Sequence, residues 1–164
     1  MSLLRSSDLR RAVGFLNDYC TPVEVHSYTQ QVLEGLYRLI DSDQWALAEF
    51  RNLNDAAEAV VTVAPQNFAL PPMKSFFAAN GVQAHLNWYG SVVRALRLSD
   101  VMSRQKFHAQ PVYRDFYRLI GAEDALFAHF DADGAMFIGG TRGSTVPTRD
   151  KELFDLLVGR SSTM

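Results

Sequence analysis

The side chains that most often perform catalysis or bind metals are few in this sequence, and they are widely spaced. The four histidines, which do not show the spacing of a zinc site, are His26, His85, His108 and His129. Cys20 is the only cysteine, so an intramolecular disulfide is impossible, and cysteine-based metal binding or redox catalysis is disfavoured. We therefore expect neither a metal ion nor a cofactor in this chain.

One short stretch does contain the residue types of a hydrolase, namely Ser99, Asp100 and His108. Such catalysis requires a nucleophile, a base and an orienting group in mutual contact. The sequence instead favours Asp100 as a helix cap and His108 as a residue at a helix end. The Asp-Ala-Asp-Gly segment at 131–134 lacks the later ligands of a calcium loop, and no glycine-rich phosphate loop is present. We predict that the chain is not an enzyme.

Aromatic side chains are the other candidate functional groups, because the sequence contains eleven Phe, six Tyr and two Trp. Large rings fill protein cores or line apolar small-molecule pockets, in which a few polar atoms orient the ligand. Our candidate ligand-binding residues are six rings and one guanidinium: Trp88, Tyr89, Arg97, Phe107, Tyr113, Tyr117 and Phe127. The alternative is that these rings only fill the space between a helix and a sheet.

The composition is typical of one folded domain that covers residues 1–164. Hydrophobic residues make up 48% of the chain and charged residues 21%, which is enough apolar material for a core. The net charge is −2 and no dense run of Lys and Arg occurs, so we expect no direct binding to nucleic acid. The sequence shows no signal peptide and no apolar run of the length that crosses a bilayer, so we expect a cytoplasmic protein without membrane contact.

Two helices are predicted at the start of the chain. Ser6-Ser7-Asp8 is typical of a helix N-terminus, and the following inward stripe is Leu9, Val13, Leu16 and Cys20. Thr21-Pro22 then favours the start of a second helix, which runs to about Asp41. The predicted inward stripe of this second helix is Val25, Tyr28, Val32, Leu36 and Leu39.

Alternating apolar residues predict two antiparallel hairpins and one further strand. The first hairpin pairs 44–52 with 57–65, and the second pairs 125–130 with 135–141 across an Asp-Gly turn. A separate strand is predicted over 92–98. This pattern favours an α+β fold with an antiparallel sheet of about five or six strands and helices packed on it.

The remaining segments are predicted to be helical. A helix opens at Pro71-Pro72, a short one runs from Val101 to about His108, and another covers 111–120 and stops at Gly121. The inward stripe of helix 111–120 is predicted to be Val112, Phe116, Leu119 and Ile120, and we expect this helix to lie over the sheet as a lid. A last helix is predicted to start at Thr148 and to end at Gly159.

This order of elements is similar to that of the GAF/PAS-like sensor fold. The segment from Arg97 resembles the N-terminal sensor domain of LuxR-type helix-turn-helix transcriptional regulators. The matching positions are Leu98, Ser99, Asp100, Phe107, Tyr113, Phe116, Tyr117 and Gly121. The C-terminal stretch TRGSTVPTRDKELFDLL resembles the last strand, turn and signalling helix of the same family.

The resemblance implies a ligand-sensing regulatory domain of a bacterial regulator, in which an unknown small molecule binds an apolar pocket and shifts the terminal helices. It also implies a homodimer. The sequence departs from the family in two ways, because no helix-turn-helix is present before Met164 and Trp45 and Trp88 lack the spacing of the acyl-homoserine-lactone-binding branch. The alternative function is a ligand-free dimerisation or scaffold module of the same GAF-like fold.

Overall fold

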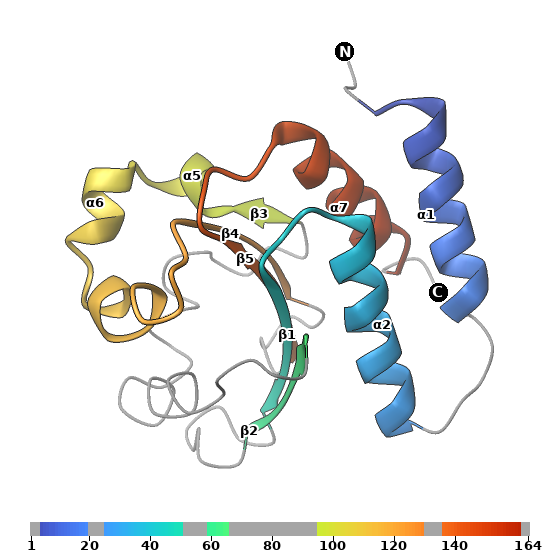
Figure 1. Ribbon diagram of the computed structural model, residues 1–164, viewed down its shortest axis with the longest axis horizontal. Helices are drawn as coiled ribbons and strands as arrows, with labels where there is room; N and C mark the ends of the chain where they lie inside the picture. Colours follow the sequence, from blue (N-terminus) through green and yellow to red (C-terminus); the bar gives the residue numbers. More distant parts are fainter. Residues whose placement is uncertain (1–3, 20–24, 51–58, 66–94, 130–135, 162–164) are drawn as a thin grey trace.

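The computed structural model describes residues 4–19, 25–50, 59–65, 95–129 and 136–161, and the fold is given for these ranges. An antiparallel five-stranded sheet lies at the centre, with helices on both of its faces (Figure 1). The described strands are β1 Gln44–Phe50, β2 Ala59–Ala64, β3 Leu96–Arg97, β4 Asp124–His129 and β5 Met136–Arg142. The α+β fold with an antiparallel sheet, as predicted from the sequence, is therefore confirmed.

The sheet has the spatial order β2-β1-β5-β4-β3. Both predicted hairpin pairs are present, because β1 pairs with β2 and β4 pairs with β5, in each case antiparallel. The two pairs are joined by β1 and β5, which lie side by side in the middle of the sheet although about a hundred residues separate them. The predicted strand over 92–98 is described only from residue 95, and its last residue, Leu98, already belongs to a helix.

Three long helices lie on one side of the sheet. The helices α2 Val25–Leu39 and α7 Thr148–Ser161 cover the sheet face, and α1 Ser6–Tyr19 packs on these two helices from the outside (Figure 1). Three short ones lie toward the other face: α5 Leu98–Val101, α6 Arg104–His108 and η2 Tyr113–Tyr117, the last a π-helix. The predicted helix at Pro71-Pro72 lies outside the described residues. No helix in the described ranges combines the length and the apolar character needed to cross a membrane.

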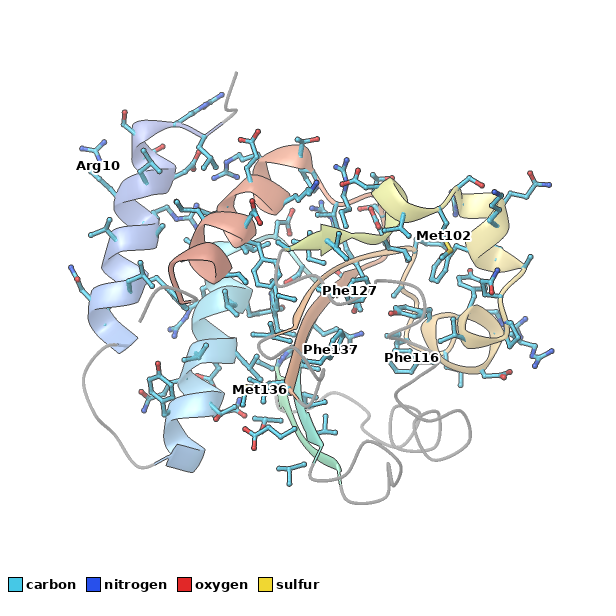
Figure 2. The ribbon with its side chains drawn as sticks, turned by 180° about the vertical axis from the view of Figure 1, so that it is seen from behind. Arg10, Met102, Phe116, Phe127, Met136 and Phe137 are labelled. Atoms are coloured by element: carbon cyan, nitrogen blue, oxygen red, sulfur yellow. The ribbon has the colours of Figure 1, made fainter. Side chains whose placement is uncertain are left out.

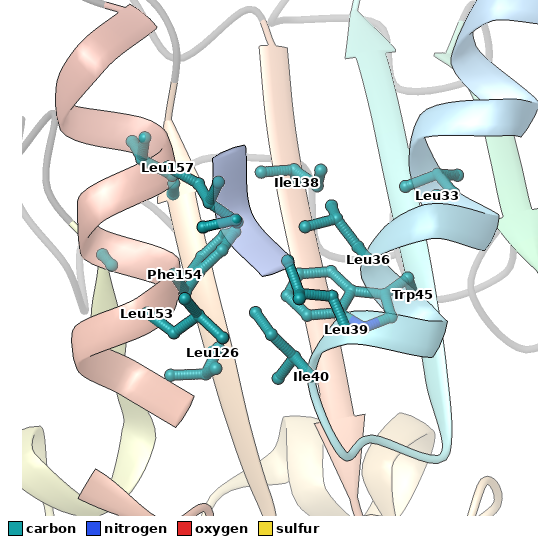
Figure 3. Close-up of a cluster of buried hydrophobic side chains, with 14 of the residues drawn as sticks. Leu33, Leu36, Leu39, Ile40, Trp45, Leu126, Ile138, Leu153, Phe154 and Leu157 are labelled. Atoms are coloured by element: carbon teal, nitrogen blue, oxygen red, sulfur yellow. The ribbon is translucent and has the colours of Figure 1, made fainter. Parts of the chain in front are cut away.

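The core on the face of the long helices is built around Trp45, which is fully buried (Figure 3). The indole ring of Trp45 lies against the ring of Phe154 from α7, with a centroid distance of 5.0 Å. Leu33 and Leu36 from α2 approach the same space from the opposite side. Trp45, which could have contacted a ligand, therefore joins the sheet to two of the three long helices.

The predicted inward stripes of the first two helices are partly wrong. On α1, Leu9 and Val13 are 45% and 49% exposed, whereas Asp8 is buried because its carboxylate pairs with Arg149 of α7. A buried ion pair on the inward face cannot be seen in a pattern of apolar residues. On α2, Tyr28 is 40% exposed rather than inward-facing. Cys20 lies outside the described residues.

The helix predicted from Val101 to about His108 starts later than expected, because Val101 is the last residue of α5 and an extended Met102-Ser103 junction separates it from α6. The predicted cap of this helix at Ser99 and Asp100 is also wrong, because both residues lie inside α5. Ser103 caps α6 instead, since its hydroxyl accepts the N–H of Lys106 at 3.4 Å.

The last helix starts at Thr148 as predicted, but its predicted end at Gly159 is wrong, because α7 continues to Ser161. A glycine inside a helix costs only about 1 kcal/mol relative to alanine. Burial of Leu153, Phe154 and Val158 on the inner side of α7 offsets that cost.

Candidate functional site

The sheet face opposite the long helices carries mostly small side chains along its central strands. Strand residues alternate between faces, and those on this face include Ala46, Ala48, Ala125, Phe127 and Phe137. Phe127 and Phe137 project from the sheet, and Phe116 projects from η2 into the same space (Figure 2). The alanines leave room above the sheet, and aromatic rings occupy it in the described part of the chain.

Four of the predicted ligand-binding residues belong to this one cluster: Phe107, Tyr113, Tyr117 and Phe127. Phe107 lies edge-on to Tyr113 and to Tyr117, with ring centroids 4.9 and 5.0 Å away. Phe107 and Tyr117 are each 1% exposed, and Phe127 packs on Phe137 at 5.7 Å. The structure thus brings the predicted rings together, and their role in binding a ligand stays a prediction.

The structure does not bring Arg97 to these rings. Leu96 pairs with Phe127 across β3 and β4, so Arg97, the next residue, lies on the opposite face of the sheet. The guanidinium of Arg97 donates to the carbonyl of Val146 at 2.9 Å and binds the carboxylate of Asp100. Arg97 therefore supports the start of α7. Trp88 and Tyr89 lie outside the described residues.

The predicted helix 111–120 contains a π-helical turn, which changes the face it presents. The N–H of Arg118 donates to the carbonyl of Tyr113 at 2.7 Å, five residues earlier. The wider turn moves the residues that follow, so Leu119 is 62% exposed and its predicted inward position is wrong. Val112 and Phe116 do face inward, and Gly121 ends the segment with a φ of 69°, a conformation that favours glycine.

A carboxylate that the sequence interpretation missed, Glu123, connects this lid to the sheet. The hydroxyl of Tyr113 in η2 donates to Glu123 Oε1 at 2.8 Å. Two side chains of α6 bind the other oxygen, His108 through Nε2 at 2.7 Å and Arg104 through Nε at 2.9 Å. The N–H of Glu123 donates to the carbonyl of Arg142, the last residue of β5. We refer to Glu123, Tyr113, His108 and Arg104 as the latch.

Electrostatics keep the latch carboxylate charged at neutral pH. Burial alone would raise the pKa of Glu123, but hydrogen bonds from His108 and Tyr113 and the charge of Arg104 outweigh burial and hold the pKa below its usual value. The hydrogen bond between Tyr113 and Glu123, together with burial, raises the pKa of the Tyr113 hydroxyl. The latch therefore consists of an anion with three donors from two elements.

Asp124, the residue after the latch carboxylate, forms a second polar contact beneath the lid. Its Oδ1 accepts the N–H groups of Ser99 and Ala125, and its Oδ2 accepts the hydroxyl of Ser99 and the N–H of Val146, all within 3.0 Å. Asp124 thereby joins α5 to the loop before α7. Because the Ser99 hydroxyl binds Asp124 while His108 binds Glu123, the structure does not assemble Ser99, Asp100 and His108 into a triad.

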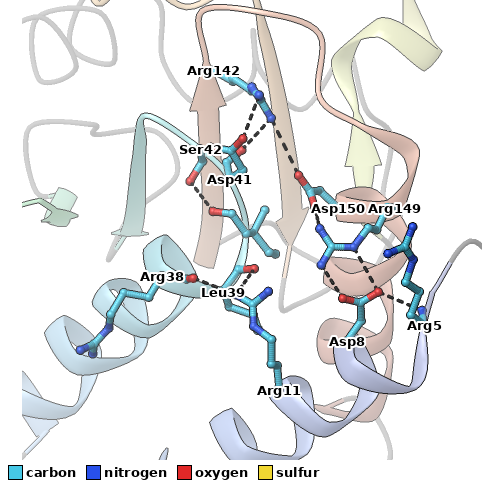
Figure 4. A network of polar contacts seen from close by, with 11 residues as sticks. Arg5, Asp8, Arg11, Arg38, Leu39, Asp41, Ser42, Arg142, Arg149 and Asp150 are labelled. Atoms are coloured by element: carbon cyan, nitrogen blue, oxygen red, sulfur yellow. Dashed lines mark hydrogen bonds and ion pairs between the residues drawn. The ribbon is translucent and has the colours of Figure 1, made fainter.

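A network of charged side chains connects α1 and α7, on the side of the sheet where the long helices lie (Figure 4). Arg149 of α7 binds the buried carboxylate of Asp8 in α1, and the bonds from Arg149 and from the Arg5 N–H hold the pKa of Asp8 far below its usual value. Burial raises the pKa of Asp150, although Arg149 and Arg142 oppose that rise. We call the contact between Asp8 and Arg149 the clamp.

Within the described ranges, no group of three or more His, Cys, Asp or Glu side chains is placed to hold a metal ion. Glu123 and Asp124 were missed because an acidic pair before a strand is indistinguishable in sequence from an exposed turn.

No family model matches the sequence, and no curated protein matches it either. Several solved structures are similar in fold, including one from Pseudomonas aeruginosa and one from Stigmatella aurantiaca. The VqsR LBD domain from Pseudomonas aeruginosa superimposes with a TM-score of 0.63 and 13% identity, over 96% of this chain and 93% of that one. The chromophore-binding domain of Stigmatella aurantiaca phytochrome P1 has a TM-score of 0.65 and 13% identity, over 99% of this chain and 63% of that one. The chain thus has a GAF-like fold.

Proposed function

We propose that this chain is the ligand-sensing regulatory domain of a bacterial LuxR-type transcriptional regulator. A small molecule binds on the lid face of the sheet, among rings that include Phe107, Tyr113, Tyr117 and Phe127, and the signal leaves through the terminal helices. The observation that carries the proposal is the likeness to the VqsR LBD domain, a LuxR-type regulator domain, over nearly the full length of both chains.

The polar contacts beneath the lid support a route for the signal. A ligand that moves the lid changes the position of α5, whose Ser99 binds Asp124. Asp124 also binds the N–H of Val146, two residues before α7 begins at Thr148. Movement of the lid therefore reaches the start of the last helix through one buried carboxylate.

A second function, a ligand-free dimerisation or scaffold module, is favoured by one specific observation. Leu9 and Val13 are 45% and 49% exposed on the same side of α1, at a spacing of one helical turn. In this alternative, α1 packs against a second copy of the chain, and the rings under the lid serve only as core.

Thermal denaturation with a broad library of small metabolites separates the two functions. A ligand that binds the native state raises the melting temperature in proportion to the logarithm of its concentration. We expect such a compound to act less on Tyr117→Phe, which alters the ring cluster, and equally on Tyr37→Phe, whose ring is 40% exposed on α2. A library without any stabilising compound would favour the scaffold function.

A further inference from the structure

A pocket of about 260 Å³ opens beside the ring cluster, at the seam between the lid and the loop that leads to α7. Residues from α5, α6, the start of β4 and the loop after β5 line it: Leu98, Ser99, Met102, Arg104, Phe107, Glu123, Asp124, Gly143, Ser144 and Thr145. The pocket therefore touches the latch carboxylate, Glu123. It also touches Ser99 and Asp124, whose hydrogen bonds connect α5 to the loop before α7.

The lining divides into an apolar wall and a polar wall. Leu98, Met102 and Phe107 form the apolar wall, which suits a short hydrocarbon body. The polar wall contains hydroxyls and the two carboxylates of Glu123 and Asp124. A molecule that fits the pocket must satisfy both walls.

Glu123 and Ser99 are the two side chains of the polar wall that we expect to accept from a ligand. A carboxylate offers about four acceptor positions. Asp124 uses all of them for the four hydrogen bonds described above, whereas Glu123 receives three donors and keeps one position open. The hydroxyl oxygen of Ser99 donates to Asp124 and can itself still accept.

The charges of the lining select the head group of the ligand. Two carboxylates face one guanidinium, and the side chain of Arg104 is 71% exposed and binds Glu123 through Nε. An anionic ligand would meet two like charges, whereas a cation is attracted and can compete with the exposed Arg104 for Glu123. A primary ammonium offers three donors and remains charged at neutral pH.

We propose that this pocket is a second binding site, which lies next to the ring-lined site and shares Phe107 with it, for a small primary amine that carries a short apolar chain. The ammonium group donates to Glu123 and to the Ser99 hydroxyl, and the chain lies against Met102 and Phe107. Because the amine contacts the lid and the loop before α7 together, its binding holds these two parts in their described arrangement.

Backbone amide NMR titration with n-butylamine, 1-butanol and butyrate tests the head group. We expect n-butylamine to shift the amide signals of residues 98–107 and 143–145 and to bind about ten-fold more tightly than 1-butanol, which corresponds to the strength of a charge-assisted hydrogen bond. Butyrate should bind least. Equal affinity for the amine and the alcohol, or no binding of the amine, would overturn the proposal.

Two substitutions change the affinity for n-butylamine in opposite directions. Glu123→Gln should weaken it about ten-fold, since the carboxylate charge is lost. Arg104→Gln should strengthen it, since a competing cation is removed from an exposed position where folding does not depend on it. The control Glu34→Gln removes a carboxylate on α2, away from the pocket, and should leave the affinity unchanged. Unchanged or weaker binding by Arg104→Gln would overturn the proposal even if Glu123→Gln did not fold.

Discussion

At the scale of single residues, the packing of the Trp45 ring on the sheet requires a glycine at position 140. They are partners on the neighbouring strands β1 and β5, and the indole ring of Trp45 lies over the backbone of Gly140. A Cβ atom at position 140 would come within 2.7 Å of that ring. Since Trp45 is fully buried against Phe154, the ring has no free space into which it can move.

We expect Gly140→Ala to destabilise the protein by about 1–3 kcal/mol, because a methyl group is forced into a filled core. Urea denaturation followed by circular dichroism measures this change. The matched control is Gly159→Ala, also a glycine but helical and with nothing within 4 Å of the added Cβ, which should stabilise by about 0.5–1 kcal/mol. Destabilisation by both substitutions alike would contradict the packing of Trp45 on Gly140.

At the scale of elements, the lid is fastened by polar side chains as well as by its rings. Here the lid is taken as residues 104–120, which contain α6 and η2, and the latch connects both elements to Glu123. An extended junction at Met102-Ser103 precedes the lid, and the left-handed Gly121 follows it. We therefore expect the lid to open separately from the sheet.

We expect Tyr113→Phe to raise the amide hydrogen exchange of residues 104–120 about five-fold, since the hydrogen bond to Glu123 contributes about 1 kcal/mol to closure. The ring remains, so the packing on Phe107 is kept. Tyr37→Phe on α2 serves as the control and should leave exchange in the lid unchanged. An equal rise across the whole sheet would indicate global destabilisation and contradict separate opening.

The clamp between Asp8 and Arg149 joins α1 to α7 and should make the docking of α1 depend on pH. The pKa of Asp8 is lowered in the folded protein, so the clamp contributes stability above the unfolded pKa of about 3.9, and this contribution is lost as the pH falls through the lower folded value. We expect Asp8→Asn to lower the thermal midpoint at pH 7 and to differ less from the wild type at pH 2. Asp18→Asn, on the exposed side of α1, should have little effect at either pH. A constant difference between Asp8→Asn and the wild type at all pH values would contradict the charged clamp.

These elements also show which features of the protein a sequence can reveal. The hairpins were predictable because alternation and the turn residues are local signals. The packing of four candidate rings into one cluster was predictable because they share one short segment, and their role in binding stays a prediction. The inward turn of Asp8 depends on Arg149, a partner 141 residues away in the chain. The latch at Glu123 depends on partners 10 to 19 residues away, which only the folding of α6 and η2 brings to it. The exposure of Leu119 depends on a π-helical turn for which the sequence has no local signal.

At the scale of the whole molecule, the contacts form one path from the lid to the terminal helices. The latch and Asp124 join the lid to the loop before α7, and the clamp joins α7 to α1. A change at the lid can therefore reach α1, where Leu9 and Val13 are exposed to solvent. The exposed apolar pair on α1 is therefore a suitable surface for contact with a second copy of the chain.

We expect the protein to form a homodimer through α1, with Leu9 and Val13 buried between the copies. The double substitution Leu9→Ser with Val13→Ser removes the apolar pair from an exposed helix face and should shift sedimentation equilibrium toward the monomer. The monomer should keep the circular dichroism spectrum of the wild type, because neither side chain belongs to the described core. Leu119→Ser is the matched control, since Leu119 is 62% exposed at the lid and should leave the oligomeric state unchanged. A wild type that is monomeric at high concentration, or a double variant that remains dimeric, would show that α1 does not join two copies.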